Sequence, residues 1–220
     1  MRFGLFFGKL AGLLLMARMI GGVDVAETYV NLLAIHPLKI NMATASALTM
    51  TSDAIAQSIE RRKARRSQGL AFVEPRHDFH RSLSMGVYGA TVLGAFVSEW
   101  FKVLSRFCPV TPGDWVSIVR KVGVNQVVIS PFLNALFFAW VTFTRNPLST
   151  TLSTKLSMLS QKLQKDLLPT YIRSCAFWVI FNLMNFGLVE AKWQVVVANV
   201  GFLAWTVYLS HVGYRAVKKQ

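Results

Sequence analysis

The feature that most constrains this chain is an aspartate inside an apolar stretch long enough to cross a membrane. The stretch covers residues 37–59, and Asp53 lies within it. A polar set recurs along this stretch at spacings of three, four and four residues: Ser46, Thr49, Asp53 and Gln57. A helix places all four on one face. A carboxylate at this depth is costly in lipid, so it faces a bundle interior, a water-filled cavity or a charged partner. The spacing therefore predicts a helix whose polar stripe turns away from lipid.

The composition indicates a membrane protein. Hydrophobic residues make up 53% of the 220 residues, charged residues make up 15%, and the mean hydropathy is +0.42. Soluble domains carry about a quarter charged residues. The net charge of +14 comes from cations that lie between and beside apolar stretches. This distribution suits membrane topology and contact with anionic lipid such as cardiolipin, and it argues against nucleic-acid binding.

Five apolar segments are near or above the length of about 20 residues that crosses a bilayer core. They cover residues 37–59, 82–104, 116–143, 168–189 and 194–212. We expect a kink in the third at Pro131. The fourth contains Arg173, Asn182 and Asn185, which makes it the weakest span by hydropathy. The prediction is an all-α integral membrane bundle of four to five transmembrane helices, formed by a single domain of residues 29–220.

Basic residues gather in alternate connections between these segments. If all five segments cross, the cations of residues 61–81, 145–165 and 215–219 share one side of the membrane. The positive-inside tendency assigns that side to the matrix or the cytoplasm, and the asymmetry favours five crossings. Leucines at spacings of three to four residues within 149–167 predict an interfacial helix that joins the third and fourth segments.

Residues 1–28 predict a separate amphipathic helix. No acidic residue occurs before Asp24, while Arg2, Lys9 and Arg18 are spread among leucines and phenylalanines. This pattern is typical of a mitochondrial presequence or a signal peptide, although no small-x-small cleavage site is evident. We expect an uncleaved helix at an interface or against a neighbour. Its targeting role is a hypothesis.

The second segment carries a seam of small residues. They recur every four residues at Gly86, Ala90, Gly94 and Ser98. Such a seam lets another helix approach closely. We expect the seam to pack within the bundle, and a homodimer interface is the alternative.

A second polar face lies on the third segment, at Gln126, Ser130 and Asn134. We expect it to meet the stripe of the first segment, with Arg120 or Lys121 near the carboxylate of Asp53. Two interpretations stay open, because both need the same residue types on the same faces. One is a narrow hydrophilic path, and the other is a set of interhelical hydrogen bonds that stabilises the bundle.

Catalytic and metal-binding patterns are absent from the sequence. The histidines are scattered at His36, His77, His80 and His211, and the cysteines Cys108 and Cys175 have no metal-ligand spacing. No Gly-rich phosphate loop, nucleophile elbow or CxxC occurs. We therefore expect no enzyme, no metal and no cofactor.

The beginning and the end of the chain carry motifs of one eukaryotic family. Its opening pattern Y-x-x-x-L-x-x-x-P…G-D…Q is similar to Tyr29, Leu33, Pro37, Ser52-Asp53 and Gln57. Its closing pattern W-x-x-x-N-x-x-N-F…W-x-x-Y-L-S is similar to Trp178, Asn182, Asn185-Phe186, Trp205 and Tyr208-Leu209-Ser210. These residues resemble the Mpv-seventeen and peroxisomal-membrane-protein-twenty-two family of small membrane proteins.

The chain departs from that family at several positions. Ser52 stands where the family has Gly, Asn125 replaces the Asp of a D-Q pair, Glu190 replaces a Pro and Gln194 replaces an Arg. The resemblance implies a helical protein of the mitochondrial inner membrane, or alternatively of the peroxisomal membrane. The family is usually described with four spans and is linked to weakly selective channel activity and to mitochondrial homeostasis.

Two hypotheses about function follow. The first is a channel-like protein in which the polar stripes form a path for small solutes: Ser46, Thr49, Asp53, Gln57, Gln126, Ser130 and Asn134, with Asn182 and Asn185 in the same polar interior. The second is a non-conducting accessory subunit built into a larger inner-membrane assembly, such as a respiratory or ATP synthase complex. The loss of an acid at Asn125 motivates the second. Other membrane subunits or a second copy of the chain are the expected protein partners.

Overall fold

The computed structural model describes residues 22–68, 76–111, 113–146, 149–189 and 194–214. All regular secondary structure in these ranges is helical, so the chain has the predicted all-α class. The N-terminal amphipathic helix was predicted for residues 1–28, and residues 1–21 lie outside the described residues. The described part begins with α2, Gly22–Ile35.

Within the described ranges, five long helical runs correspond to the five apolar segments. The first is α3, Pro37–Gln68, and the last is α10, Gln194–Tyr214. The second run consists of α4, Phe79–Tyr88, the π-helix η2, Gly89–Phe96, and α5, Val97–Phe107. The third consists of α6, Trp115–Val124, the π-helix η3, Asn125–Ile129, and α7, Ser130–Arg145. The fourth consists of α8, Leu152–Lys162, the π-helix η4, Leu163–Leu167, and α9, Leu168–Leu188.

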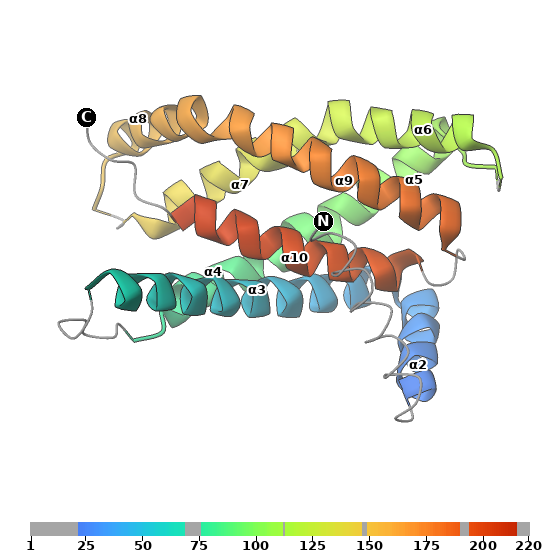
Figure 1. Ribbon diagram of the computed structural model, residues 1–220, viewed down its shortest axis with the longest axis horizontal. Helices are drawn as coiled ribbons and strands as arrows, with labels where there is room; N and C mark the ends of the chain where they lie inside the picture. Colours follow the sequence, from blue (N-terminus) through green and yellow to red (C-terminus); the bar gives the residue numbers. More distant parts are fainter. Residues whose placement is uncertain (1–21, 69–75, 112, 147–148, 190–193, 215–220) are drawn as a thin grey trace.

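The long runs lie side by side along the length of the molecule (Figure 1). α3 packs against α4, η2 and α10, while α9 packs against α6, α7 and α10. α2 turns away from the beginning of α3 (Figure 1). The apolar core is aromatic and includes Tyr88, Phe137, Phe138, Trp205 and Leu209. Aromatic rings bury large areas, so a few of them hold α4, α7 and α10 together.

The distribution of polarity is that of a membrane bundle. Thr49, Ser52 and Asp53 are almost completely buried, whereas Val119, Val127 and Ile180 are more than half exposed. Exposed large apolar side chains occur on every long run except the last among the described residues. Polar side chains that turn inward and apolar ones that turn outward are what lipid surroundings require.

Three helical runs in the described residues are long and apolar enough to cross a bilayer: Phe79–Phe107, Trp115–Arg145 and Leu152–Leu188. α3, the expected first span, falls outside this set. Its inward face carries polar groups such as Asp53 and Gln57, which lower the hydropathy of the helix. The number of four or five crossings therefore stays a prediction.

Two helices continue further than the apolar pattern indicated. α3 runs past residue 59 to Gln68, because the basic residues after Glu60 are good helix formers and favour the negative end of the helix dipole. The stretch 149–167 does not form a separate interfacial helix, since α8 passes through η4 into α9 without a break. Lys155, Lys162 and Asp166 are buried, so one face of this polar stretch packs inside the bundle.

Wide π-helical turns precede two helical prolines. η3 ends directly before Ser130-Pro131, and η4 ends directly before Leu168-Pro169. A proline removes one backbone donor and its ring collides with the carbonyl four residues earlier. A π-helical turn shifts this carbonyl away and is common at functional sites. The irregularity expected at Pro131 therefore takes the form of a wider turn.

The small-residue seam of the second run faces α3. A Cβ built on Gly94 would lie 2.5 Å from Cα of Met42, and one on Gly86 would lie 2.7 Å from Cγ of Met50. Ser98 accepts a hydrogen bond from Nδ2 of Asn41 at 3.0 Å. Ala90 is only half-buried, and Gly89 makes the close approach to Ala45 in its place. Gly86, Gly94 and Ser98 thus contact α3 within the chain.

We expect Gly94→Ala to destabilise the protein by about 1–3 kcal/mol, the usual effect of adding a methyl group to a packed contact. The new Cβ would meet the backbone of α3, which cannot move aside without separating the two helices. Chemical unfolding in detergent micelles measures the change. Gly123→Ala is the matched control, because a Cβ there meets nothing within 4 Å. Equal stability of the two variants would contradict the packing role of the seam.

Candidate functional site

The carboxylate of Asp53 lies in a network of charged and polar side chains. Nε of Arg81 is 2.7 Å from its Oδ1, and Ser210 donates to the same oxygen. Its Oδ2 accepts hydrogen bonds from Oγ of Ser82 at 2.7 Å and from Nε2 of Gln57 at 2.8 Å. Asp53 is completely buried. Both oxygens are thus neutralised or hydrogen-bonded, as a buried carboxylate requires.

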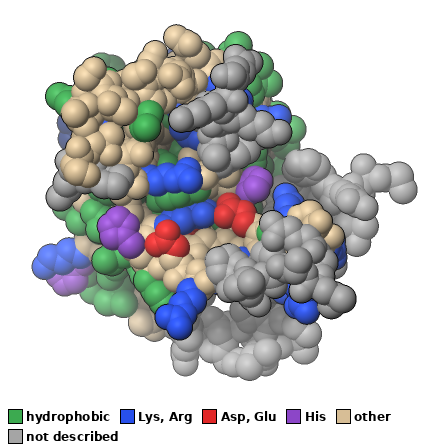
Figure 2. Space-filling view, turned by 90° about the vertical axis from the view of Figure 1, so that its left-hand side faces the viewer, with side chains coloured by type: hydrophobic (Ala, Val, Ile, Leu, Met, Phe, Trp, Pro, Cys, Tyr) green, Lys and Arg blue, Asp and Glu red, His purple; other side chains and the backbone are tan. Residues whose placement is uncertain are grey.

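The guanidinium of Arg81 joins this network to a second acid. Its Nη1 and Nη2 lie 2.9 Å and 3.2 Å from the carboxylate oxygens of Glu60. Its planar group stacks over the ring of Tyr214 at 4.0 Å, and Nδ1 of His211 is 3.2 Å from Glu60. We call Asp53, Gln57, Glu60, Arg81, Ser82, Ser210 and His211 the charged cluster. It joins α3, α4 and α10 at one end of the bundle, where Figure 2 shows acidic, basic and histidine side chains together.

The cation beside Asp53 comes from the second run, and the expectation of Arg120 or Lys121 was wrong. Arg120 is exposed on α6. Lys121 is buried and donates a hydrogen bond to Oγ of Ser105 at 2.9 Å. Arg81 directly precedes an apolar segment, which is why the sequence alone suggested a loop cation.

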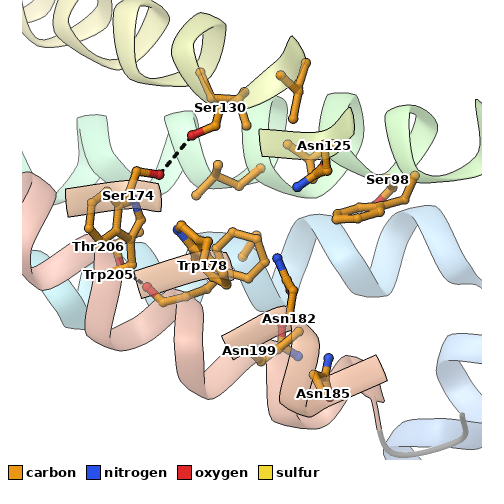
Figure 3. Close-up of a pocket in the computed structure, with 18 of the residues that line it drawn as sticks. Ser98, Asn125, Ser130, Ser174, Trp178, Asn182, Asn185, Asn199, Trp205 and Thr206 are labelled. Carbon is orange, nitrogen blue, oxygen red and sulfur yellow. Dashed lines mark hydrogen bonds between the residues drawn. The ribbon is translucent and has the colours of Figure 1, made fainter. Parts of the chain in front are cut away.

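A cavity of about 580 Å³ lies between the helical runs, separate from the charged cluster. Its wall is formed by α3, the end of α4, η2, α5, α6, η3, α7, α9 and α10. Amide and hydroxyl side chains project into it from several helices (Figure 3), among them Ser98, Asn125, Ser130, Ser174, Asn182, Asn185 and Asn199. Trp178 and Trp205 are among the apolar side chains that line it. The volume lies in the range of about 300–1,000 Å³ that is typical of small-molecule sites.

One side of the cavity is held by a hydrogen-bonded network between the third and fourth runs. Oγ of Ser130 is 2.9 Å from Oγ of Ser174, as the dashed line in Figure 3 marks. Nε2 of Gln126 donates to Ser130 at 2.9 Å and to Ser174 at 3.3 Å. Asn134 donates to the backbone carbonyl of Ser130 at 2.9 Å. These bonds hold the two runs at a fixed spacing on this side of the cavity.

Other polar side chains of the cavity keep hydrogen-bond donors or acceptors that the described residues do not use. Asn182 makes no side-chain hydrogen bond to any described residue, and Figure 3 shows it projecting from α9 into the pocket. Nδ2 of Asn185 donates to the backbone carbonyl of Gln194 at 3.1 Å. Its buried Oδ1 has no hydrogen-bond partner among the residues that the structure describes. Because a buried polar atom without a partner is costly, these amides suit a polar solute or water.

The polar stripe predicted for the first segment divides between the cavity and the charged cluster. Thr49 lines the cavity, and Asp53 and Gln57 belong to the charged cluster. Ser46 is half-buried near Gly86, on the side of the helix seam. On the other runs, Gln126, Ser130, Asn134, Asn182 and Asn185 all line the cavity. The structure thus brings together the amides of the third and fourth runs, but it does not bring them to Asp53.

Several residues of the cavity and the charged cluster were not among the site residues predicted from the sequence, although Ser210 belongs to the closing motif quoted above. They are Asn41, Glu60, Arg81, Ser82, Ser174, Asn199, Thr206 and Ser210. Ser174 lies eight residues before Asn182, so an inward face on the fourth segment was the signal that could have found it. Ser82 and Ser210 resemble ordinary small residues at the ends of apolar segments. In the described residues, no group of three or more His, Cys, Asp or Glu side chains could hold a metal ion.

Comparison with known proteins identifies relatives along most of the chain. A model of the Mpv17 / PMP22 family matches residues 151–210. The mitochondrial inner membrane protein Mpv17 of Danio rerio is 30% identical over 84% of this chain and 94% of its own length. PXMP2/4 family protein 4 of Dictyostelium discoideum is 29% identical over 89% of this chain and 97% of its own length. The human mitochondrial inner membrane protein Mpv17 is 29% identical over 86% and 97%. No solved structure matches the chain.

We expect Asp53→Asn to destabilise the bundle by about 3–5 kcal/mol, because it removes one partner of a buried ion pair. Adding Arg81→Gln should recover part of this loss, so that the double variant loses less than the sum of the two single variants. Unfolding of the purified variants in detergent measures these values.

Glu99→Gln serves as the control, since Glu99 and Lys102 form an exposed pair at 2.7 Å. Its effect should stay below about 1 kcal/mol. If Asp53→Asn costs no more than Glu99→Gln, the charged cluster does not stabilise the fold.

Proposed function

This chain belongs to the Mpv17/PMP22 family, and we propose that it is a channel-like membrane protein that passes small polar solutes. The observation that carries the proposal is the cavity of about 580 Å³, lined by amides and hydroxyls inside an apolar exterior. Polar groups buried in a membrane bundle mark solute and ion pathways. We place the path in this cavity.

The charged cluster has a structural part in this proposal. Both oxygens of Asp53 are engaged by Arg81, Gln57, Ser82 and Ser210. Such a closed network leaves no acceptor for a passing solute. The amides of Asn182 and Asn185, in contrast, keep free donors and acceptors beside the cavity.

The names of the relatives support a location in the mitochondrial inner membrane. Two of them, from Danio rerio and human, are named mitochondrial inner membrane proteins. The name of the Dictyostelium relative, PXMP2/4 family protein 4, fits the peroxisomal alternative. An apolar exterior and a basic net charge of +14 suit the mitochondrial inner membrane as well as any anionic bilayer.

We expect purified protein in liposomes to release entrapped radiolabelled mannitol and to retain dextran. Asn182→Leu should lower the mannitol rate severalfold, because an apolar side chain at this point narrows and dewets the path. Ile180→Leu is the matched control, since Ile180 lies on the same helix and is exposed on the outside. Size-exclusion chromatography checks that both variants fold.

Absence of mannitol release from the unaltered protein would contradict the channel-like proposal. The second hypothesis, a non-conducting accessory subunit, would then remain. Native electrophoresis after extraction of the cellular membrane in mild detergent tests it. Migration as a free monomer or dimer would contradict stable incorporation into a larger complex.

A further inference from the structure

We propose that the cavity binds small anions at Lys121 and therefore favours the passage of anions over cations. This inference deepens the proposed function and rests on it for the statement about passage. It concerns a residue that the family motifs quoted above do not include. The geometry around Lys121 carries the inference.

The ammonium group of Lys121 is buried beside the cavity without an acidic partner. The residue is 8% exposed and lines the cavity. Its Nζ donates to Oγ of Ser105 at 2.9 Å and lies 5.5 Å from the ring centre of Phe186. No carboxylate lies within ion-pair distance of Nζ in the described part of the chain. Since an ammonium group has three donors, at least one remains available for an anion.

Two other buried cations of the bundle have acidic partners, while Nζ of the buried Lys155 donates to the backbone carbonyl of Asn146 at 3.3 Å. Nε of Arg81 is paired with Asp53 at 2.7 Å, and Nζ of Lys162 lies 3.4 Å from Oδ2 of Asp166. A buried charge without a counter-ion is costly unless a ligand or water compensates it. Lys121 therefore differs from Arg81 and Lys162 by facing a space that a mobile anion can enter.

The rest of the cavity wall does not neutralise Lys121. Among the described residues that line the cavity, none is Asp or Glu. The other lysine of the wall is Lys102, whose Nζ is 2.7 Å from the carboxylate of Glu99 at an exposed position. A cation that enters the cavity meets one uncompensated positive charge. An anion that enters is attracted by the same charge, so the cavity favours anions over cations.

Amide groups near Lys121 add neutral hydrogen-bond donors. Asn125 follows Lys121 by one helical turn, and its Oδ1 accepts a bond from Nε1 of Trp100 at 2.9 Å. The amide NH₂ of Asn125 is thereby left for other acceptors. Asn182 faces the same cavity from α9 (Figure 3). Amide donors around an ammonium group suit carboxylates and halide ions, which accept hydrogen bonds but cannot donate them.

Planar-bilayer recording in a KCl gradient tests the preference through the reversal potential. We expect chloride to be more permeant than potassium in the unaltered protein. Lys121→Gln should lower the permeability ratio by roughly tenfold, the factor that corresponds to about 1.4 kcal/mol. Asn125→Asp should lower it as well, because it places a carboxylate one helical turn from Lys121. Arg120→Gln is the matched control, since the neighbouring Arg120 is exposed outside the cavity.

A binding measurement separates this inference from the proposed function. Potassium acetate should raise the melting temperature of the detergent-solubilised protein, and the rise should be smaller in Lys121→Gln than in Arg120→Gln. Binding without conduction would contradict the channel-like function and retain the anion site. Conduction with a cation preference, or with a ratio that Lys121→Gln does not change, would overturn the inference. Equal acetate effects in the two variants would overturn it too.

Discussion

The ion pair between Asp53 and Arg81 fixes the arrangement of three helices. A carboxylate removed from water is strongly unfavourable unless a cation and several donors compensate it. Here the compensating groups come from α4, the next described helix along the chain, and from α10, which is distant from α3 in the sequence. Because Asp53 has to satisfy all of them at once, α3, α4 and α10 have one relative position at this end. The rest of the bundle is built outward from that point.

The element pattern could be predicted from the sequence with good accuracy. Apolar segments of bilayer length identified all five long helical runs, since length and hydropathy are local properties of the chain. The ends of the helices were harder to predict from the sequence. α3 continues to Gln68 because helix propensity, which hydropathy does not measure, persists through the basic residues. Pro169 did not end a helix because a π-helical turn before it removes the clash.

The site was predicted in part, and helix geometry explains the error. A stripe with spacings of four residues is not straight on a helix of 3.6 residues per turn, and from Thr49 to Gln57 it rotates by about 80°. Thr49 therefore faces the cavity, whereas Gln57 faces the beginning of α4. The sequence shows that both side chains turn away from lipid. Which neighbour each one meets depends on how the runs pack, and this information is not local.

The charged cluster and the cavity differ in how completely their polar groups are hydrogen-bonded. Because of this difference, the residues that stabilise the fold are not the ones that set the selectivity of the cavity. Asn125 illustrates the separation. Nε1 of Trp100 needs only an oxygen acceptor at this position, and an amide or a carboxylate supplies one equally well. The contact between Trp100 of α5 and residue 125 of η3 therefore places little constraint on the charge at residue 125. The family pattern has an acid there, while this chain has an amide beside an uncompensated Lys121. A change of one functional group can thus reverse the electrostatic character of the cavity and leave the charged cluster, and with it the fold, untouched.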